Sequence, residues 1–202
     1  MTRASADTDE RMVETTTLRE TLAGLRVIGE EAVRPMRLSL GRHGQLSAIV
    51  VYRGGDEALE VVDGFKRLRA ARELAWREVR VRALPVDVVG ATVALATLNE
   101  GHGLTELEEA WLCRALYRQH GLGQPEIGRL LGRHKSWVCR RLTLAESLHE
   151  RVQADVRLGL VSSRAAADLG RLSRDNQPTA SIVAQRHGMT AADDARPHVR
   201  AA

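Results

Sequence analysis

Three cations follow a glycine at the point where a strand-like run of residues gives way to a helical pattern. Gly64 ends the run, and Lys66, Arg67 and Arg69 stand in the first turns of the segment that follows. A glycine lets the backbone approach a ligand, the N–H groups of a helix N-terminus point outward, and adjacent cations complete a site for an anion. The same cluster would also suit the solvated face of a helix. These residues alone leave both interpretations open.

A second candidate site is the segment "GQPEIGRLLGRHKSWVCRRLTL", residues 123–144. A helix-turn-helix needs an apolar face on its first helix, a small residue where the helices cross and a glycine in the turn. Its second helix needs an inward β-branched residue followed by a leucine. We assign these positions to Ile127, Leu130 and Leu131, to Gly128 and Gly132, and to Val138 and Leu142.

The outward side chains of this segment are basic or polar, and no acidic residue lies between Arg129 and Arg141. We expect them to contact base edges and phosphates of double-stranded DNA. A helical hairpin with a solvated basic face is the alternative, and Cys139 is interpreted as a packing residue on the helix flank. The candidate DNA-binding residues are Arg129, Arg133, His134, Lys135, Ser136, Trp137, Arg140 and Arg141.

Composition sets outer bounds on these interpretations. The 202 residues give room for one or two small domains, and 44% hydrophobic with 28% charged residues is an ordinary globular balance. The net charge of +4 does not by itself indicate a polyanionic partner. Cys113 and Cys139 lie outside any CxxC or His-rich spacing, so we expect neither a disulfide framework nor a metal site. No apolar run is long enough for a membrane span, and we expect a cytoplasmic protein.

The first half of the chain predicts strands interleaved with helices, which is typical of a compact α+β domain. Pro35 must lie in the first turn of its helix, because an interior proline would break it. The predicted elements are a disordered tail over 1–19, a strand over 22–27, a helix over 30–44, a hairpin of strands 49–52 and 59–62, the helix after Gly64, and a strand around Val79 and Val81.

The second half predicts only helices. Thr105 and Glu108 have the spacing of a capping box, and the helix that they begin ends at Gly121. The sequence thus predicts an α+β domain over 20–100, an all-α helix-turn-helix domain over 104–174, and a partly helical C-terminal tail over 175–202.

The order of these parts resembles the ParB family of chromosome and plasmid partition proteins. The resemblance covers roughly residues 22–172 and includes "HGQ" at 43–45, the box Gly64, Lys66, Arg67, Arg69 and Ala70, and "GLVSSRAAADL" at 159–169. It implies a ParB/sulfiredoxin-like N-terminal fold, and the cysteine that sulfiredoxin carries in the corresponding box is missing here.

The resemblance implies that the arginine box cradles the triphosphate of CTP, with magnesium, and that nucleotide binding closes a DNA clamp used in plasmid or chromosome partition. The implied nucleotide ligands are Gly64, Lys66, Arg67, Arg69 and Asn99. A homodimer, a ParA-type partner ATPase and a nucleoid- or plasmid-associated location are implied as well.

Two departures from the family pattern limit these expectations. The motif Glu-Asn-x-x-Arg is represented by "TLNEGHGL", in which Asn99 is kept but the segment from Gly101 to Gly103 replaces the arginine. We therefore expect a weak CTPase at most. Little sequence follows residue 175, so we expect no C-terminal dimerisation domain of the family's kind.

Two other functions stay open at this point. The α+β domain could be only a protein-contact module of a ParB-like transcriptional regulator or mobile-element accessory protein that has no nucleotide switch. A metal-dependent nuclease would need converging carboxylates. Asp63 and Asp87 are its candidates, although each suits a turn or cap position better.

Overall fold

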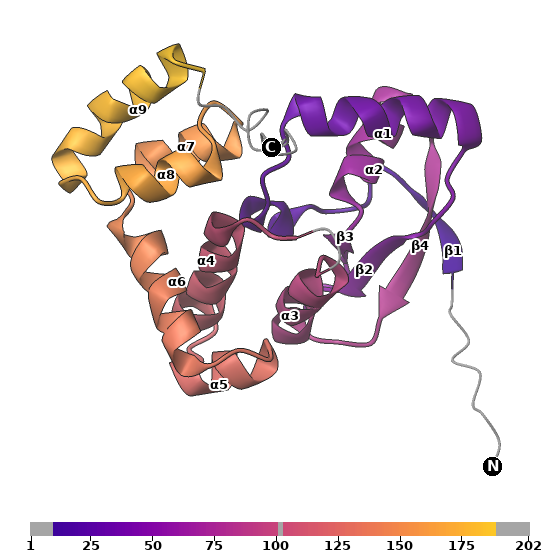
Figure 1. Cartoon of the computed structure of the whole chain (residues 1–202). Helices are drawn as coiled ribbons and strands as arrows, with labels where there is room; N and C mark the ends of the chain where they lie inside the picture. The colour runs from indigo at the N-terminus through magenta and orange to yellow at the C-terminus, as the bar shows by residue number, and fades with distance from the viewer. Residues whose placement is uncertain (1–9, 101–102, 189–202) are drawn as a thin grey trace, which may run out of the picture. The chain divides into compact units, whose positions relative to one another are not determined.

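The computed structural model describes residues 10–100 and 103–188, and these divide into two compact units. The first unit holds the described residues up to Ala23 together with Glu30–Leu95, and the second holds Gly24–Gly29 and the described residues from Ala96 onward. Figure 1 labels the helices and strands of both units. Along the described residues no helix is both long and apolar enough to cross a membrane.

The first unit is built on a mixed sheet. Its strands are β1 (Glu10–Glu14), β2 (Ile49–Arg53), β3 (Leu59–Asp63) and β4 (Glu78–Leu84). The helical elements are η1 (Thr21–Leu25), a short 3-10 helix that crosses the unit boundary, α1 (Glu30–His43), α2 (Phe65–Glu73) and α3 (Val88–Leu98), whose last residues belong to the second unit.

The sheet has the order β1-β4-β2-β3, with β4 parallel to β2 and the other two pairs antiparallel. Ile49 and Val51 of β2 and Val61 of β3 are fully buried, as expected for strands packed beneath helices. Helix α2 packs on β2, and α1 packs on α2 (Figure 1). The predicted α+β fold and its hairpin are therefore confirmed.

Gln45 completes the sheet where β2 begins. Its side-chain nitrogen Nε2 donates to the carbonyl of Arg80 at 2.7 Å, and its Oε1 accepts from the Arg80 N–H at 2.7 Å. The amide thus imitates one further residue of β2 beside β4. The "HGQ" segment has a structural role at this position, because it satisfies backbone groups that the strand cannot reach.

The N-terminal segment differs from its prediction. Residues 10–14 were expected to be disordered, but they form β1, which pairs with β4 over Glu10–Glu14. Thr15 and Leu18 beyond the strand are 4% and 3% exposed. The prediction is wrong for residues 10–19 because the strand's partner lies far along the chain, where no local pattern reveals it. Residues 1–9 lie outside the described residues.

Three further expectations need correction. The strand expected over 22–27 is replaced by the 3-10 helix η1. Pro35 lies inside α1 and beyond its first turn, so the helix tolerates one missing backbone hydrogen bond there. Helix α3 was not anticipated, because "VVGATVALATL" is apolar all round and shows no helical period.

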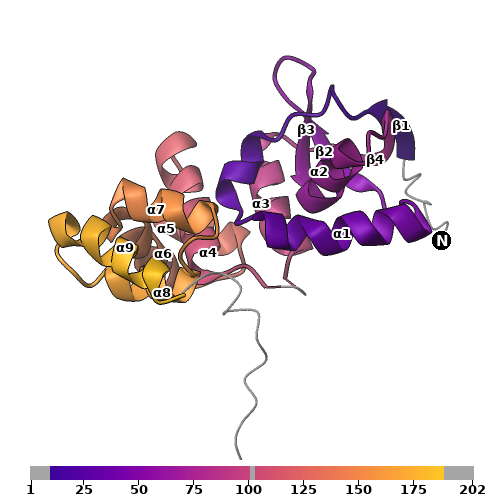
Figure 2. The ribbon, with the colours of Figure 1, turned by 90° about the horizontal axis from the view of Figure 1, so that it is seen from above.

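The second unit is helical. It comprises α4 (Glu106–Arg114), a π-helical turn η2 (Ala115–Gln119), α5 (Gln124–Leu130), α6 (Lys135–Ser147), α7 (Glu150–Arg157), α8 (Ser163–Leu169), the short η3 (Arg174–Asn176) and α9 (Gln177–Arg186). Helices α7, α8 and α9 gather at one end of this unit (Figure 2). Because α9 packs on α7 and α8 and buries Gln177, it belongs to the unit and not to a separate tail.

Trp111 lies at the centre of the helical core. Its indole N–H donates to the side-chain oxygen of Gln153 at 3.0 Å, and the Gln153 amide donates in turn to the carbonyls of Ala145 and Leu148. Arg157 covers the indole ring, with its guanidinium carbon 4.3 Å from the ring centroid. A buried indole and a buried amide thus satisfy each other, and the ends of α6 and α7 are fixed to α4.

Glu108 is a buried carboxylate that joins two distant segments of this unit. It accepts from the backbone N–H of Thr105 at 2.8 Å, which completes the predicted capping box. It also accepts from the backbone N–H of Val27 at 2.9 Å and pairs with Arg26 at 3.2 Å. With only 3% of Glu108 exposed, the carboxylate both begins α4 and holds Gly24–Gly29 against the helices.

We predict that Glu108→Ala lowers the free energy of unfolding by about 3–5 kcal/mol, because Arg26 and two backbone donors lose a buried partner. Urea denaturation followed by circular dichroism measures the change. The exposed Glu150 of α7 provides the control, since Glu150→Ala removes the same charge and should cost less than about 1 kcal/mol. Equal losses for the two variants would contradict the role given to Glu108.

Candidate nucleic-acid interface and anion site

Gly128 of α5 lies directly against the backbone of the turn that leads into α6. A Cβ atom at this position would lie 2.6 Å from the carbonyl oxygen of Arg133, and the Arg133 N–H donates to the Gly128 carbonyl at 2.7 Å. Gly132 makes the turn with a φ of +62°, which favours glycine. The two helices therefore have helix-turn-helix geometry, and glycine is required at the crossing.

The inward positions of this motif agree only partly with the prediction. Ile127 and Val138 are fully buried, and Leu142 is 5% exposed. Leu130, expected on the inward face of the first helix, is 42% exposed because α5 ends at that residue. The inward contacts of α5 therefore depend mainly on Ile127.

We predict that Gly128→Ala destabilises the helical unit by about 1–3 kcal/mol, because the methyl group forces the two backbones apart. Thermal or urea unfolding measures the change. Gly41 of α1 is the matched control, because a Cβ atom added there would meet nothing within 4 Å. Gly41→Ala should stabilise by about 0.5–1 kcal/mol, and a similar gain at position 128 would show that the crossing has room.

The exposed side of this motif carries basic and polar residues. It runs from the end of α5 through the turn and along α6, and we refer to it as the α6 surface. Its exposed residues are Arg129, Arg133, His134, Lys135, Ser136, Cys139, Arg140 and Thr143. All the predicted DNA-binding residues except Trp137 and Arg141 are among them. Cys139 was expected to pack on the flank, which is wrong, because it lies exposed between Ser136 and Arg140.

His134 and Ser136 also form the N-terminal cap of α6. The His134 Nδ1 accepts from the backbone N–H of Ser136 at 3.2 Å and lies 2.8 Å from the Ser136 hydroxyl oxygen. His134 is therefore the N-cap of the helix. Lys135 and Arg140 carry the positive charge of the α6 surface next to this cap.

Arg141 and Trp137 are half-buried, which differs from their predicted outward placement. Arg141 forms a salt bridge to Glu109 of α4 at 2.7 Å and another to Glu106 at 3.3 Å, and only 15% of its side chain is exposed. Its guanidinium carbon also lies 5.1 Å from the centroid of the Trp137 ring. Arg141 therefore links α6 to α4, and its charge is already paired with two carboxylates.

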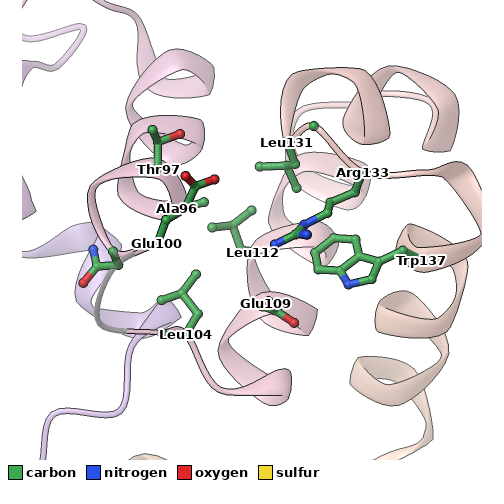
Figure 3. Close-up of a pocket in the computed structure, with 12 residues that line it drawn as sticks. Ala96, Thr97, Glu100, Leu104, Glu109, Leu112, Leu131, Arg133 and Trp137 are labelled. Carbon is green, nitrogen blue, oxygen red and sulfur yellow. The ribbon is translucent and has the colours of Figure 1, made fainter.

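A pocket of about 490 Å³ lies beside this contact. Leu104, Leu112 and Leu131 line its apolar part, and Arg133 and Trp137 form one wall (Figure 3). The guanidinium carbon of Arg133 lies 5.5 Å from the Trp137 ring centroid. The indole thus supports Arg133 at the turn where the α6 surface begins.

The second candidate site is the N-terminus of α2. Gly64 is the N-cap, with a φ of +97°, and a Cβ there would lie 3.0 Å from Arg67 Nη1 and 3.2 Å from Ile49 Cγ1. Glycine therefore allows α2 to begin directly against β2. Lys66, in the first turn, is half-buried. Gly64, Lys66 and Arg67 therefore lie at one helix end.

Arg67 is partly structural. Its Nη1 donates to the Ala48 carbonyl at 2.9 Å. Burial lowers the pKa of Arg67, and the nearby Asp63 partly offsets this effect; a guanidinium remains charged in any case. Arg67 thus holds the chain just before β2 begins.

Arg69 points to a different neighbour. Its Nε donates to Glu20 Oε2 at 2.9 Å, and Arg72 of the same helix donates to the other oxygen of Glu20. Neither Glu20 nor Glu109 is predicted as a partner from the sequence, since each lies far from its arginine along the chain, where no spacing rule applies.

Asn99 and Asp87 lie near opposite ends of α3. Asn99 is 8% exposed and lines the 490 Å³ pocket, so it belongs to the second unit, whereas the α2 box belongs to the first. Gly101 of the altered third motif lies outside the described residues. Asp87 accepts from the Gly90 N–H at 2.8 Å and begins α3, which is the cap position that its spacing suggested.

The two cysteines lie in different environments. Cys113 is buried, and burial raises the pKa of its thiol to about 12. Among the residues that the structure describes, no group of three or more His, Cys, Asp or Glu side chains is arranged to hold a metal ion.

The chain combines a small α+β unit that carries an arginine box with a helical unit that carries a helix-turn-helix. This combination is typical of a DNA-binding protein. Residues 2–97 match the family model described as the ParB N-terminal domain. These residues belong to the ParB N-terminal domain family.

Individual relatives agree with this assignment. A nucleoid occlusion protein from Oceanobacillus iheyensis is 31% identical over 159 residues, which are 77% of this chain and 55% of that protein. The chain spans about half the length of the curated relatives it matches. A Pnob8-like ParB-N domain shares the fold with a TM-score of 0.52 at 13% identity, over 92% of this chain and 93% of that chain.

A C-terminally truncated chromosome-partitioning protein ParB from Caulobacter crescentus, solved with CTP-gamma-S, is a further similar structure. Its TM-score is 0.42 at 22% identity, over 86% of this chain and 98% of that chain.

Proposed function

We propose that the chain is a sequence-specific DNA-binding protein of the ParB type. The observation that carries this proposal is the α6 surface, an exposed basic surface on a helix-turn-helix whose crossing and turn are both made by glycine. Cations placed this way bind the phosphate backbone, and the first residues of the second helix reach base edges in the major groove.

The orientation of α6 divides the surface into two parts. Lys135, Ser136 and Arg140 lie on the exposed face and suit base edges, whereas Arg129 at the end of α5 suits a phosphate. Cys139 shares the exposed face with them and extends the contact area. A single helix-turn-helix buries little surface, so tight binding calls for two copies on a palindromic site.

We predict that Lys135→Ala changes sequence preference, at a cost of about 1–3 kcal/mol for each base contact that it removes. Arg129→Ala should weaken binding to all DNA equally and lower the slope of log affinity against log salt by about one. Binding to a selected site and to scrambled DNA across a salt series measures both effects.

Arg186 of α9 gives a matched control for these variants, because it is exposed in the same unit but lies outside the helix-turn-helix. Arg186→Ala removes the same charge and should leave the sequence preference and nearly all of the salt slope unchanged. If Lys135→Ala and Arg129→Ala lose affinity identically on both DNAs, α6 is only a basic surface and the proposal of specific recognition fails.

We further propose that the α2 box binds the phosphates of a cytidine nucleotide and that this binding regulates the DNA contact, as in a ParB clamp. The box match and the placement of Gly64, Lys66 and Arg67 at one helix N-terminus support this. The first backbone N–H groups of a helix have no intrahelical partner, and Lys66 adds a mobile charge beside them. The altered third motif still leads us to expect little hydrolysis.

We predict that Lys66→Ala weakens binding of CTP by about tenfold or more, because it removes a flexible cation from the start of the helix. Calorimetry with CTP, and with ATP and GTP for comparison, measures the loss. Arg77→Ala is the control, since Arg77 is a cation of the same unit with 85% of its side chain exposed. Unchanged CTP affinity in Lys66→Ala would show that the cations of the box are only the solvated face of a helix.

A further inference from the structure

The pocket beside the helix-turn-helix has the size and lining of a site for a small organic molecule. Every residue listed along its wall belongs to the second unit, and its volume is about 490 Å³. Leu104, Leu112 and Leu131 form its apolar part, and Leu112 is only 1% exposed. Ligand sites of this size are lined mainly by apolar side chains, with a few polar groups that select the ligand. Selection in this pocket therefore depends on its aromatic and charged residues.

Trp137 gives the pocket an aromatic face that attracts cations. The guanidinium carbon of Arg133, which also lines the pocket, lies 5.5 Å from the centroid of the Trp137 ring. The face of an indole carries negative potential, and a positive group within about 6 Å of it is stabilised. Within the described residues, the Arg133 side chain has this ring contact and no salt bridge. The indole thus already holds a cation, and no described carboxylate keeps that cation in place.

The charged residues of the lining favour a positive ligand. They are Glu100, Glu109 and Arg133. Glu109 is already bound to Arg141 at 2.7 Å. Glu100 is exposed, lies across the pocket from Arg133 and Trp137 (Figure 3), and forms no salt bridge within the described parts of the chain. A cation between Glu100 and the indole would gain from both, whereas an anion would meet two carboxylates.

We propose that this pocket binds an aromatic ammonium ion, a flat ring that carries an ammonium group on a short chain. The ring packs against the leucines and the Trp137 face, as aromatic rings do, and the ammonium group lies beside the Glu100 carboxylate. The ligand replaces Arg133 at the indole, and Arg133 moves into solvent without losing a salt bridge to any described residue. This site is separate from the nucleotide site proposed at α2 and takes a ligand of opposite charge.

The test is calorimetry of the full chain with three compounds that share an indole ring and differ in charge, namely tryptamine, indole and indole-3-acetate. Tryptamine should bind roughly tenfold more tightly than indole-3-acetate, with indole between them, because only tryptamine supplies the positive charge. An equal concentration of CTP should leave the affinity for tryptamine within about twofold, since the nucleotide belongs to another site.

Substitutions in the lining separate the effect of charge from that of ring packing. Glu100→Gln should weaken tryptamine binding by about threefold to fivefold and leave indole binding within about twofold. Arg133→Gln should strengthen tryptamine binding by about threefold, because it removes the cation that competes for the indole face. Both side chains are exposed, so we expect these variants to fold.

Two substitutions at position 137 test the aromatic face itself. Trp137→Leu keeps an apolar side chain and should weaken tryptamine binding by about fivefold or more. Trp137→Phe keeps an aromatic ring and should retain most of the affinity. Circular dichroism shows whether each variant is folded.

Glu150 and Arg186 provide matched controls, because both are exposed residues of the second unit that do not line the pocket. Glu150→Gln and Arg186→Gln change the net charge as the lining variants do. They should leave the affinities for all three compounds within about twofold, since charges outside the pocket are screened by salt.

Any of five outcomes would overturn the inference. They are no binding of tryptamine at millimolar concentration, equal affinities for the three compounds, a loss in Glu100→Gln no larger than that in Glu150→Gln, weaker tryptamine binding in Arg133→Gln, and displacement of tryptamine by CTP. The DNA contact of the α6 surface and the nucleotide site at α2 are tested by other measurements and do not depend on this result.

Discussion

The helical unit depends on one buried carboxylate. Glu108 accepts from the backbone N–H at the start of α4 and, from a segment 81 residues earlier, the N–H of Val27 and the guanidinium of Arg26. A buried carboxylate is costly unless its oxygens are satisfied, so these donors must assemble together or not at all. That requirement explains why Gly24–Gly29 belongs to the helical unit although the chain on both sides of it belongs to the first unit. The start of α4 in turn sets the position of Glu109, which holds α6.

The α6 surface follows from two constraints of different kinds. Gly128 has no side chain, so α5 lies directly against the backbone of residues 133–135, where the turn leads into α6. The rotation of α6 about its own axis is fixed by Arg141, which is held by Glu109 and stacks on Trp137. Two residues that the sequence predicted as DNA contacts thus decide which of their neighbours face outward. Their pairing also lowers the number of available cations, which moves the expected base contacts towards Lys135 and Arg140.

The sequence predicted well whatever depends on neighbours within one turn or one hairpin. The β2–β3 hairpin, the capping box of Thr105 and the glycines of the helix-turn-helix all have signals of a few residues, and the structure contains each of them. It predicted poorly what depends on distant partners. Strand β1 exists only through β4, and helix α3 has no period because it is apolar on every side. The ion pairs of Glu20 and Glu109 could not be predicted for the same reason. Their partners are 49 and 32 residues away along the chain, and no sequence spacing indicates a salt bridge over such a distance.

Those hidden pairs change how the basic clusters should be understood. A count of cations treats Arg67, Arg69 and Arg141 as equivalent ligands, but their partners differ. Arg67 donates to a backbone carbonyl, Arg69 binds a carboxylate that it shares with Arg72, and Arg141 binds two carboxylates. An arginine that already holds a carboxylate contributes little net charge to an incoming phosphate, and the phosphate must compete with an anion whose position the fold has already fixed. Lysine at position 66 differs, because a flexible side chain with a single charged group can follow a ligand. The anion affinity of each cluster therefore depends less on how many cations it contains than on which of them already have a partner in the folded protein.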